Sequence, residues 1–157
     1  MTDVALVPAE DWHAEFIAGH PREADVLELA AVGSTPMQAM TGGMRSSFEP
    51  LTGIVDGVPV CMFGVTTYSV LGGIGVPWLV GSAEMDRLTV HKALLRESRK
   101  AIVRMRQTFP SLLFNAVDDR NDAAKRWLSW LGFTLEDPRP LGRNGEPFRV
   151  FYWKGNP

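Results

Sequence analysis

The sequence predicts a single α/β (α+β) domain, spanning residues 1–157, with a mixed central β-sheet flanked by helices. A chain of 157 residues is long enough for one hydrophobic core. Its composition, 45% apolar and 22% charged, is that of a globular protein and excludes disorder and fibrous repeats. Strand-like and helix-like segments alternate after an antiparallel pair, which is typical of mixed sheets.

The first fifty residues predict one strand and three helices. An apolar run that ends at Pro8 predicts the strand. Thr35 followed by Pro36 has the pattern of a helix start, with a side-chain cap and proline at the first helical position. Gly42 and Gly43 are expected to end that third helix. The strand is expected over residues 4–7, and the helices over residues 9–18, 21–33 and 36–41.

Residues 57–83 carry no charge and are long enough to span a bilayer. Their prolines and glycines break helices and favour strands and turns, so this segment predicts buried β-structure and no membrane span. Asp56-Gly57 is a strong signal for a hairpin turn. The expected strands cover residues 51–55, 58–65 and 76–80.

The second half predicts a long helix, a strand, a short helix and a last strand. The long helix is expected over residues 89–109 and ends at Pro110. Asn121 is a good N-cap for the short helix, and Gly132 stands where a helix typically ends. The short helix should bury Trp127, Leu128 and Leu131, so that Leu131→Ala costs roughly 2–5 kcal/mol. The strands are expected over residues 113–117 and 148–153.

Charge is unevenly distributed along the chain. Residues 1–82 carry a net charge of −7 and residues 83–157 a net charge of +5. Six basic residues lie on the long helix, where they form either a phosphate- or nucleic-acid-binding stripe or a solvated face. They are Lys92, Arg96, Arg99, Lys100, Arg104 and Arg106. A single cysteine, Cys61, and three histidines make a disulfide framework and a metal site improbable.

A strand followed by Asn121-x-x-Ala124 and by Leu131-Gly132-Phe133 resembles the end of the GNAT acyltransferase superfamily. A narrower likeness runs from about residue 51 to 153. It comprises the Asp-Gly hairpin, the strand end at residues 77–82, the long basic helix and the final Phe148-x-x-Phe151 segment, and it is similar to phage-encoded GNAT-like proteins, including a small internal virion protein. The resemblance implies one GNAT-like domain.

Two positions depart from the pattern of active members of this superfamily. Their loop before the long helix carries glycines that hold the coenzyme A pyrophosphate on backbone N–H groups. Residues 82–90 of this chain contain no glycine and carry Glu84 and Asp86. Leu128 stands where many members place a tyrosine that protonates the leaving thiolate. The expected cofactor is therefore none, or weakly bound acetyl-CoA or coenzyme A.

The resemblance also marks candidate site residues. The catalytic candidates are Glu84, Asp86 and His91, which stand beside the implied acyl site. The candidates for cofactor binding are Val80, Gly81, Arg87, Lys92 and Asn121.

Three functions fit these observations. The first is a catalytically degenerate phage or prophage GNAT-fold protein that acts in virion morphogenesis or binds other phage or host proteins, located in the host cytoplasm or the virion. The second is an acetyl-CoA-dependent N-acetyltransferase with an atypical cofactor loop. The third is a nucleic-acid-binding accessory domain that uses the basic helix.

Overall fold

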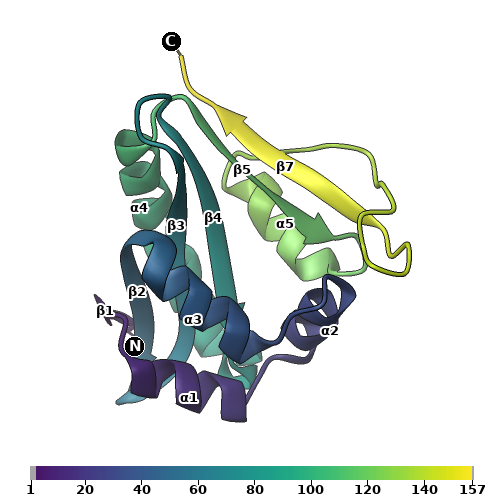
Figure 1. Cartoon of the computed structure of the whole chain (residues 1–157). Helices are drawn as coiled ribbons and strands as arrows, with labels where there is room; N and C mark the ends of the chain where they lie inside the picture. Colours follow the sequence, from purple (N-terminus) through teal and green to yellow (C-terminus); the bar gives the residue numbers. More distant parts are fainter. Residues whose placement is uncertain (1–2, 157) are drawn as a thin grey trace.

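The computed structural model describes residues 3–156, which form a seven-stranded mixed sheet with helices on both faces (Figure 1). The strand order is β1-β2-β3-β4-β5-β7-β6. The strands are β1 (Ala5–Pro8), β2 (Ser47–Val55), β3 (Val58–Ser69), β4 (Ile74–Gly81), β5 (Leu112–Asp118), β6 (Thr134–Leu135) and β7 (Phe148–Lys154). The helices are α1 (Asp11–Gly19), α2 (Glu23–Ala31), α3 (Pro36–Ser46), α4 (Leu88–Thr108) and α5 (Asp122–Trp130), with a short 3-10 helix η1 (Ala83–Asp86).

The uncharged middle of the chain forms β3 and β4, which confirms the prediction of β-structure there. β2 and β3 are an antiparallel hairpin whose turn residues, Asp56 and Gly57, have φ of +50° and +77°. This is the conformation that favours Asp-Gly in two-residue hairpins. Within residues 3–156, no helix combines the length and the apolar character needed to cross a membrane.

Helices α1 and α3 cover one face of β2–β4. Ile17 of α1, Met40 of α3 and Met62 of β3 are completely buried there. The expectation that Gly42 and Gly43 end α3 is wrong, because the helix continues to Ser46. Gly43 faces the indole of Trp78, and any Cβ at this position would collide with the indole. Neither glycine terminates the helix, and Gly43 permits its close packing on Trp78.

Helices α4 and α5 lie on the opposite face. Asn121 caps α5 by accepting a hydrogen bond from Ala124 N–H at 3.2 Å, and Gly132 has a φ of +100°, as predicted for the residues at its two ends. The prediction that α5 turns its apolar face inward is confirmed, since Ala124, Trp127 and Leu128 pack against the core clusters, but these side chains are only partly buried. No side chain of α5, which is described along its whole length, is fully buried. The face is turned toward a cavity, as the site geometry shows.

The sheet opens between β4 and β5. In the described part of the chain, their parallel pairing covers only Ile74 with Leu112 and Gly75 with Leu113. Beyond these pairs the two strands diverge, and Figure 1 shows them meeting at the top of the view and separating toward α2. β5 continues on its other edge as a regular antiparallel partner of β7. The fold thus contains a wedge with β4 and β5 as its two sides.

Candidate active site between β4 and β5

The narrow end of the wedge is held by the side-chain amide of Asn115 in β5. Its Nδ2 donates to the Pro77 carbonyl of β4 at 2.8 Å, and its Oδ1 accepts from Ala116 N–H at 2.8 Å. The amide therefore replaces the backbone pairing that stops at Gly75. Because Pro77 has no N–H, no backbone donor is left unpaired at this position of the edge.

Beyond Pro77, the backbone of β4 faces the wedge through the N–H and C=O of Leu79. Antiparallel pairing turns alternate residues of β4 toward β3 and away from it. Pro77 and Gly81 point away from β3, since their carbonyls accept from Asn115 and from Arg22 N–H. Leu79 lies midway and has the same orientation, so its N–H and C=O point into the wedge. A strand-like chain can add to such an edge.

The wide end of the wedge is bridged by α2. Asp25 accepts a hydrogen bond from Gly81 N–H at the end of β4, at 2.7 Å. Glu28, one helical turn later, accepts from Asp118 N–H at the end of β5, also at 2.7 Å. The two carboxylates stand at i and i+3, hence on one face of the helix. One helix therefore satisfies the last N–H groups of both strands.

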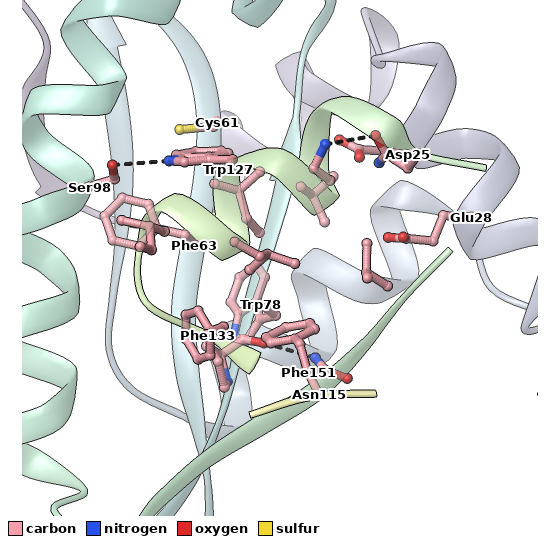
Figure 2. A pocket seen from close by; sticks show the side chains of 18 of the residues that line it. Asp25, Glu28, Cys61, Phe63, Trp78, Ser98, Asn115, Trp127, Phe133 and Phe151 are labelled. Atoms are coloured by element: carbon pink, nitrogen blue, oxygen red, sulfur yellow. Dashed lines mark hydrogen bonds between the residues drawn. The ribbon is translucent and has the colours of Figure 1, made fainter. Parts of the chain in front are cut away.

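Between the two ends lies a cavity of about 390 Å³, a size typical of small-molecule sites. Its wall is mainly apolar and combines α4 and α5 with β3, β4, Phe133 and Phe151. Figure 2 shows Trp127 and Phe63 on one side of it and Asp25 and Glu28 on another. The apolar side chains of α5 line this space, which explains why none of them is fully buried.

Burial changes the acidity of the two carboxyl groups of α2. It raises the pKa of Glu28 from 4.5 to about 7, although the hydrogen bond from Asp118 N–H lowers it, and the nearby charge of Asp25 raises it further. Burial also raises the pKa of Asp25, against the hydrogen bond from Gly81. A carboxyl group with a pKa near 7 is suited to accept a proton at neutral pH.

Cys61 lines the same cavity, but its thiol is unreactive. The side chain is 1% exposed, and burial raises its pKa to about 12. A nucleophilic cysteine needs the thiolate form near neutral pH. Cys61 is therefore a small buried residue of the cavity wall.

The three predicted catalytic residues lie outside the cavity wall. Glu84 pairs with Arg87 at 2.8 Å, and Asp86 pairs with Nε of Arg22 at 3.1 Å. His91 is exposed near the start of α4. Across residues 3–156, the cavity lining contains none of these candidates, so their catalytic role stays a prediction.

The five predicted cofactor-binding residues are divided between the cavity and the surface. Val80 and Asn121 line the cavity, and Gly81 meets it through its hydrogen bond to Asp25. Arg87 and Lys92 are exposed at the start of α4. The two carboxylates before α4 are each paired with an arginine, so the repulsion they would exert on an anion is reduced.

Several basic residues of α4 have partners inside the fold. Arg99 stacks on Trp130 at 4.1 Å, and Arg106 donates to the Leu131 carbonyl at 2.8 Å. Arg104 pairs with Glu49 and Lys100 with Glu97. With Arg96, which pairs with Asp3 at 4.0 Å, partners within the fold account for five of the six charges without nucleic acid. No three His, Cys, Asp or Glu side chains within residues 3–156 are grouped as metal ligands would be.

The sequence carries little signal that Arg22, Asp25, Glu28 and Asn115 belong to the site. The acids of α2 have the spacing of an ordinary solvated helix face. Their partners lie 56 and 90 residues away, at the ends of strands that only the tertiary structure brings together. The one available signal is that the acids alternate with apolar residues within a short helix, a pattern shared by many surface helices.

Neither a protein-family model nor a curated protein matches this sequence. Solved structures, however, are similar over almost the whole chain. Spermidine N-acetyltransferase from Vibrio cholerae, in complex with CoA and spermine, has a TM-score of 0.73 and 8% identity over 97% of this chain and 95% of its own. Ard1 from Thermoplasma volcanium has a TM-score of 0.72 and 15% identity over 98% and 99%.

A GNAT-family acetyltransferase from Streptococcus pneumoniae has a TM-score of 0.64 and 16% identity over 98% of this chain and 100% of its own. Identities this low show a shared fold and leave activity open. The phage-encoded likeness expected from the sequence has no counterpart among these three structures. A single domain with a sheet that opens between β4 and β5 therefore has the fold of the GNAT acetyltransferases.

Proposed function

We propose that this protein transfers an acyl group from a coenzyme A thioester to a primary amine. The observation that carries the proposal is the wedge itself. It combines the β4 edge at Leu79, an apolar cavity and, at its wide end, a partly buried carboxyl group whose pKa is raised to about 7. A linear ligand can enter such a wedge only in extended form, with its polar groups aligned to the β4 strand.

The β4 side of the wedge, where the acyl donor would bind, suits an extended ligand that carries amide groups. The pantetheine arm of coenzyme A has two amide groups separated by short alkyl segments. Such an arm can pair with the N–H and C=O of Leu79 while its alkyl parts contact the apolar wall. The phosphates would then lie toward the start of α4, where Arg87 and Lys92 are exposed and the helix dipole favours anions.

The acceptor side suits an amine. Asp25 and Glu28 form an acidic wall that attracts a cationic amine, and attack requires the neutral form. In the proposed step, Glu28 takes the proton of the amine, and the amine nitrogen then forms a bond with the thioester carbonyl carbon. The carbon–sulfur bond breaks and the thiolate leaves. The bonded nitrogen gives its second proton to water, and the thiolate takes one proton from water. Glu28 returns its proton to solvent.

A second candidate is a GNAT-fold protein without acyl transfer, which would serve as a protein-interaction component, for example in a phage virion. Two observations favour it. Leu128 cannot protonate a leaving thiolate, and the turn before α4, residues Ser82 to Arg87, contains no glycine. For the transferase, water at the open end of the wedge would protonate the leaving thiolate in place of a tyrosine.

The test is acyl transfer from acetyl-CoA to a panel of primary amines, comprising a polyamine, free amino acids and peptides with free N-termini. Release of the coenzyme A thiol reports turnover. Glu28→Gln keeps the acceptor for Asp118 N–H but cannot take a proton, so turnover should fall roughly 10²–10⁴-fold with an unchanged Kd for coenzyme A. Glu23→Gln, an exposed position on the same helix, is the matched control and should leave turnover unchanged.

The two candidates give opposite results in this assay. Turnover with one amine class that disappears in Glu28→Gln supports the transferase. Absence of turnover with every amine, together with absence of coenzyme A binding by calorimetry, would overturn it and favour the second candidate.

A further inference from the structure

The cavity opens to solvent beside the end of α2. Two apolar residues of its lining are half-exposed there, Val32 at 50% and Leu141 at 47%. Val32 directly follows the last residue of α2, and Leu141 belongs to the loop that precedes β7. Leu29, which is partly buried on the same helix, continues the apolar wall inward. The wide end of the wedge thus opens through an apolar mouth, formed by Val32 and Leu141.

The loop of residues 139–146, which carries one side of the mouth, is tied to the end of α2. Arg143 N–H donates to the Ala31 carbonyl at 2.7 Å. Inside the loop, Asn144 N–H donates to Glu146 Oε1, also at 2.7 Å. Figure 1 shows the loop before β7 reaching α2 at the wide end of the wedge. The mouth is therefore preformed, and a ligand does not have to order it.

The mouth lies on the helix face that carries the two carboxylates. Asp25, Glu28 and Val32 stand at i, i+3 and i+7, which places them on one side of α2. Val32 follows Glu28 by four positions, or about 6 Å along a helix. Figure 2 shows the Glu28 carboxylate directed from α2 into the cavity. A substituent on an amine nitrogen at Glu28 therefore reaches the mouth within a few bonds.

The charge beside the mouth is positive. The guanidinium of Arg143 lies against Gly33, the residue after Val32. Glu146 of the same loop accepts from Asn144 N–H, and its charge acts on Arg120. An ammonium group at Glu28 is attracted by the carboxylates, but a second ammonium farther out would meet the like charge of Arg143. The mouth thus favours an apolar substituent over a second cation.

We infer that the mouth is a subsite for the acceptor, and that the acceptor is a primary amine with a branched or aromatic apolar group and no second cation. Covering Val32 and Leu141 removes apolar surface from water, which favours such a group. The α-amine of a leucine-like residue has this chemistry, both in a free amino acid and at the start of a peptide. A polyamine lacks it. The inference rests on the proposed function, because that function places the amine at Glu28.

Turnover with acetyl-CoA measures the preference. Leucinamide should be used about tenfold better than glycinamide, which lacks the side chain, and better than spermidine. Val32→Ala and Leu141→Ala should each lower kcat/KM for leucinamide about three- to tenfold and leave that for glycinamide within about twofold. Leu27→Ala is the matched control, because Leu27 is on the same helix, is 51% exposed and is not part of the described cavity lining. Its values should equal those of the parent.

Two further substrates and one variant sharpen the test. Free leucine compared with leucinamide distinguishes a free amino acid from the start of a peptide, and preference for either over glycinamide fits the subsite. Arg143→Glu keeps the backbone bond to Ala31 and reverses the charge beside the mouth. It should raise the use of spermidine relative to leucinamide about threefold or more. An unchanged ratio would contradict the exclusion of a second cation.

Binding without acetyl-CoA separates the subsite from the reaction. In NMR titrations of the full chain, leucinamide should shift the methyl signals of Val32 and Leu141, and glycinamide should not. If leucinamide shifts these signals and no amine is acetylated, the subsite stands and the proposed function is wrong. If amines are acetylated without preference for leucinamide, the subsite is wrong and the proposed function stands. Absence of both binding and turnover would overturn both.

Discussion

Helices α3 and α5 are both short, both N-capped by a polar side chain, and both packed against the same sheet, yet their apolar faces serve different purposes. Met40 of α3 is fully buried, and Gly43 brings the helix into direct contact with Trp78. Leu128 and Leu131, on and just after α5, are only half-buried and line the cavity. The apolar face of α5 meets the open wedge and lines a cavity, whereas that of α3 meets a closed strand pair and forms core.

The largest expected contrast comes from truncating one side chain under each helix. Met40→Ala should lower the free energy of unfolding by about 2–5 kcal/mol, because it opens a cavity in a fully packed region. Leu131→Ala should cost about 1 kcal/mol, less than the roughly 2–5 kcal/mol expected from the sequence for a fully buried leucine, because it enlarges a space that already exists. Urea unfolding measures both, and equal losses would contradict the difference between the two helices.

Gly43 sharpens the comparison on the α3 side. Alanine normally improves a helix interior by up to about 1 kcal/mol. At position 43 the added Cβ would collide with Trp78, so Gly43→Ala should instead destabilise by about 1–3 kcal/mol. Gly42→Ala is the control, since nothing lies within 4 Å of a Cβ there. A thermal shift of opposite sign for the two variants is the expected result, and a stabilising Gly43→Ala would refute close packing.

The pH dependence of the free energy of unfolding should differ between a variant at the wide end of the wedge and one in the core under α3. The pKa of Glu28 is raised from 4.5 to about 7, so the folded chain holds this proton more tightly than the unfolded chain. The stabilising contribution is therefore present below about pH 4.5 and decreases as pH rises toward 7, by roughly 1–3 kcal/mol. Glu28→Gln should flatten this part of the stability profile, whereas Met40→Ala should shift the whole profile and keep its slope.

The smallest effects are expected at the caps. Thr35 accepts from Gln38 N–H at 3.2 Å, and Asn121 accepts from Ala124 N–H at the same distance. Each alanine replacement should cost about 0.5–2 kcal/mol. Hydrogen exchange should show the α3 loss as a global effect and the α5 loss as local opening of α5, because α3 has fully buried residues and α5 has none along its described length. Global opening in Asn121→Ala would contradict this division.

Most elements of the fold follow from local patterns, and their observed ends lie close to the expected ones. Asp-Gly, Thr-Pro, the Asn121 cap and Gly132 each act through their own backbone or their immediate neighbours, so the sequence predicts them directly. The short strand β6 was not expected, because two residues carry no detectable periodicity. The extent of α3 was also misjudged, since the purpose of Gly43 depends on Trp78, a residue 35 positions away in the sequence.

The residues that line the cavity were less predictable from the sequence than the fold. Reasoning from the resemblance led to the loop before α4, and the expected catalytic residues there lie off the cavity wall. Asp25 and Glu28 act at the wide end because α2 crosses the ends of both β4 and β5. Their raised pKa values come from burial between elements, which no local pattern records.

The sequence by itself determined the alternation of strands and helices, the hairpin turn and the caps, because turn geometry and periodicity are local properties of the chain. Only the tertiary structure decided that β4 and β5 separate after two residue pairs, that Asn115 holds their narrow end, and that α2 closes the wide one. The physical reason is that strand divergence depends on hydrogen bonds between segments tens of residues apart. Each of these bonds joins residues whose types carry no sign of their partner.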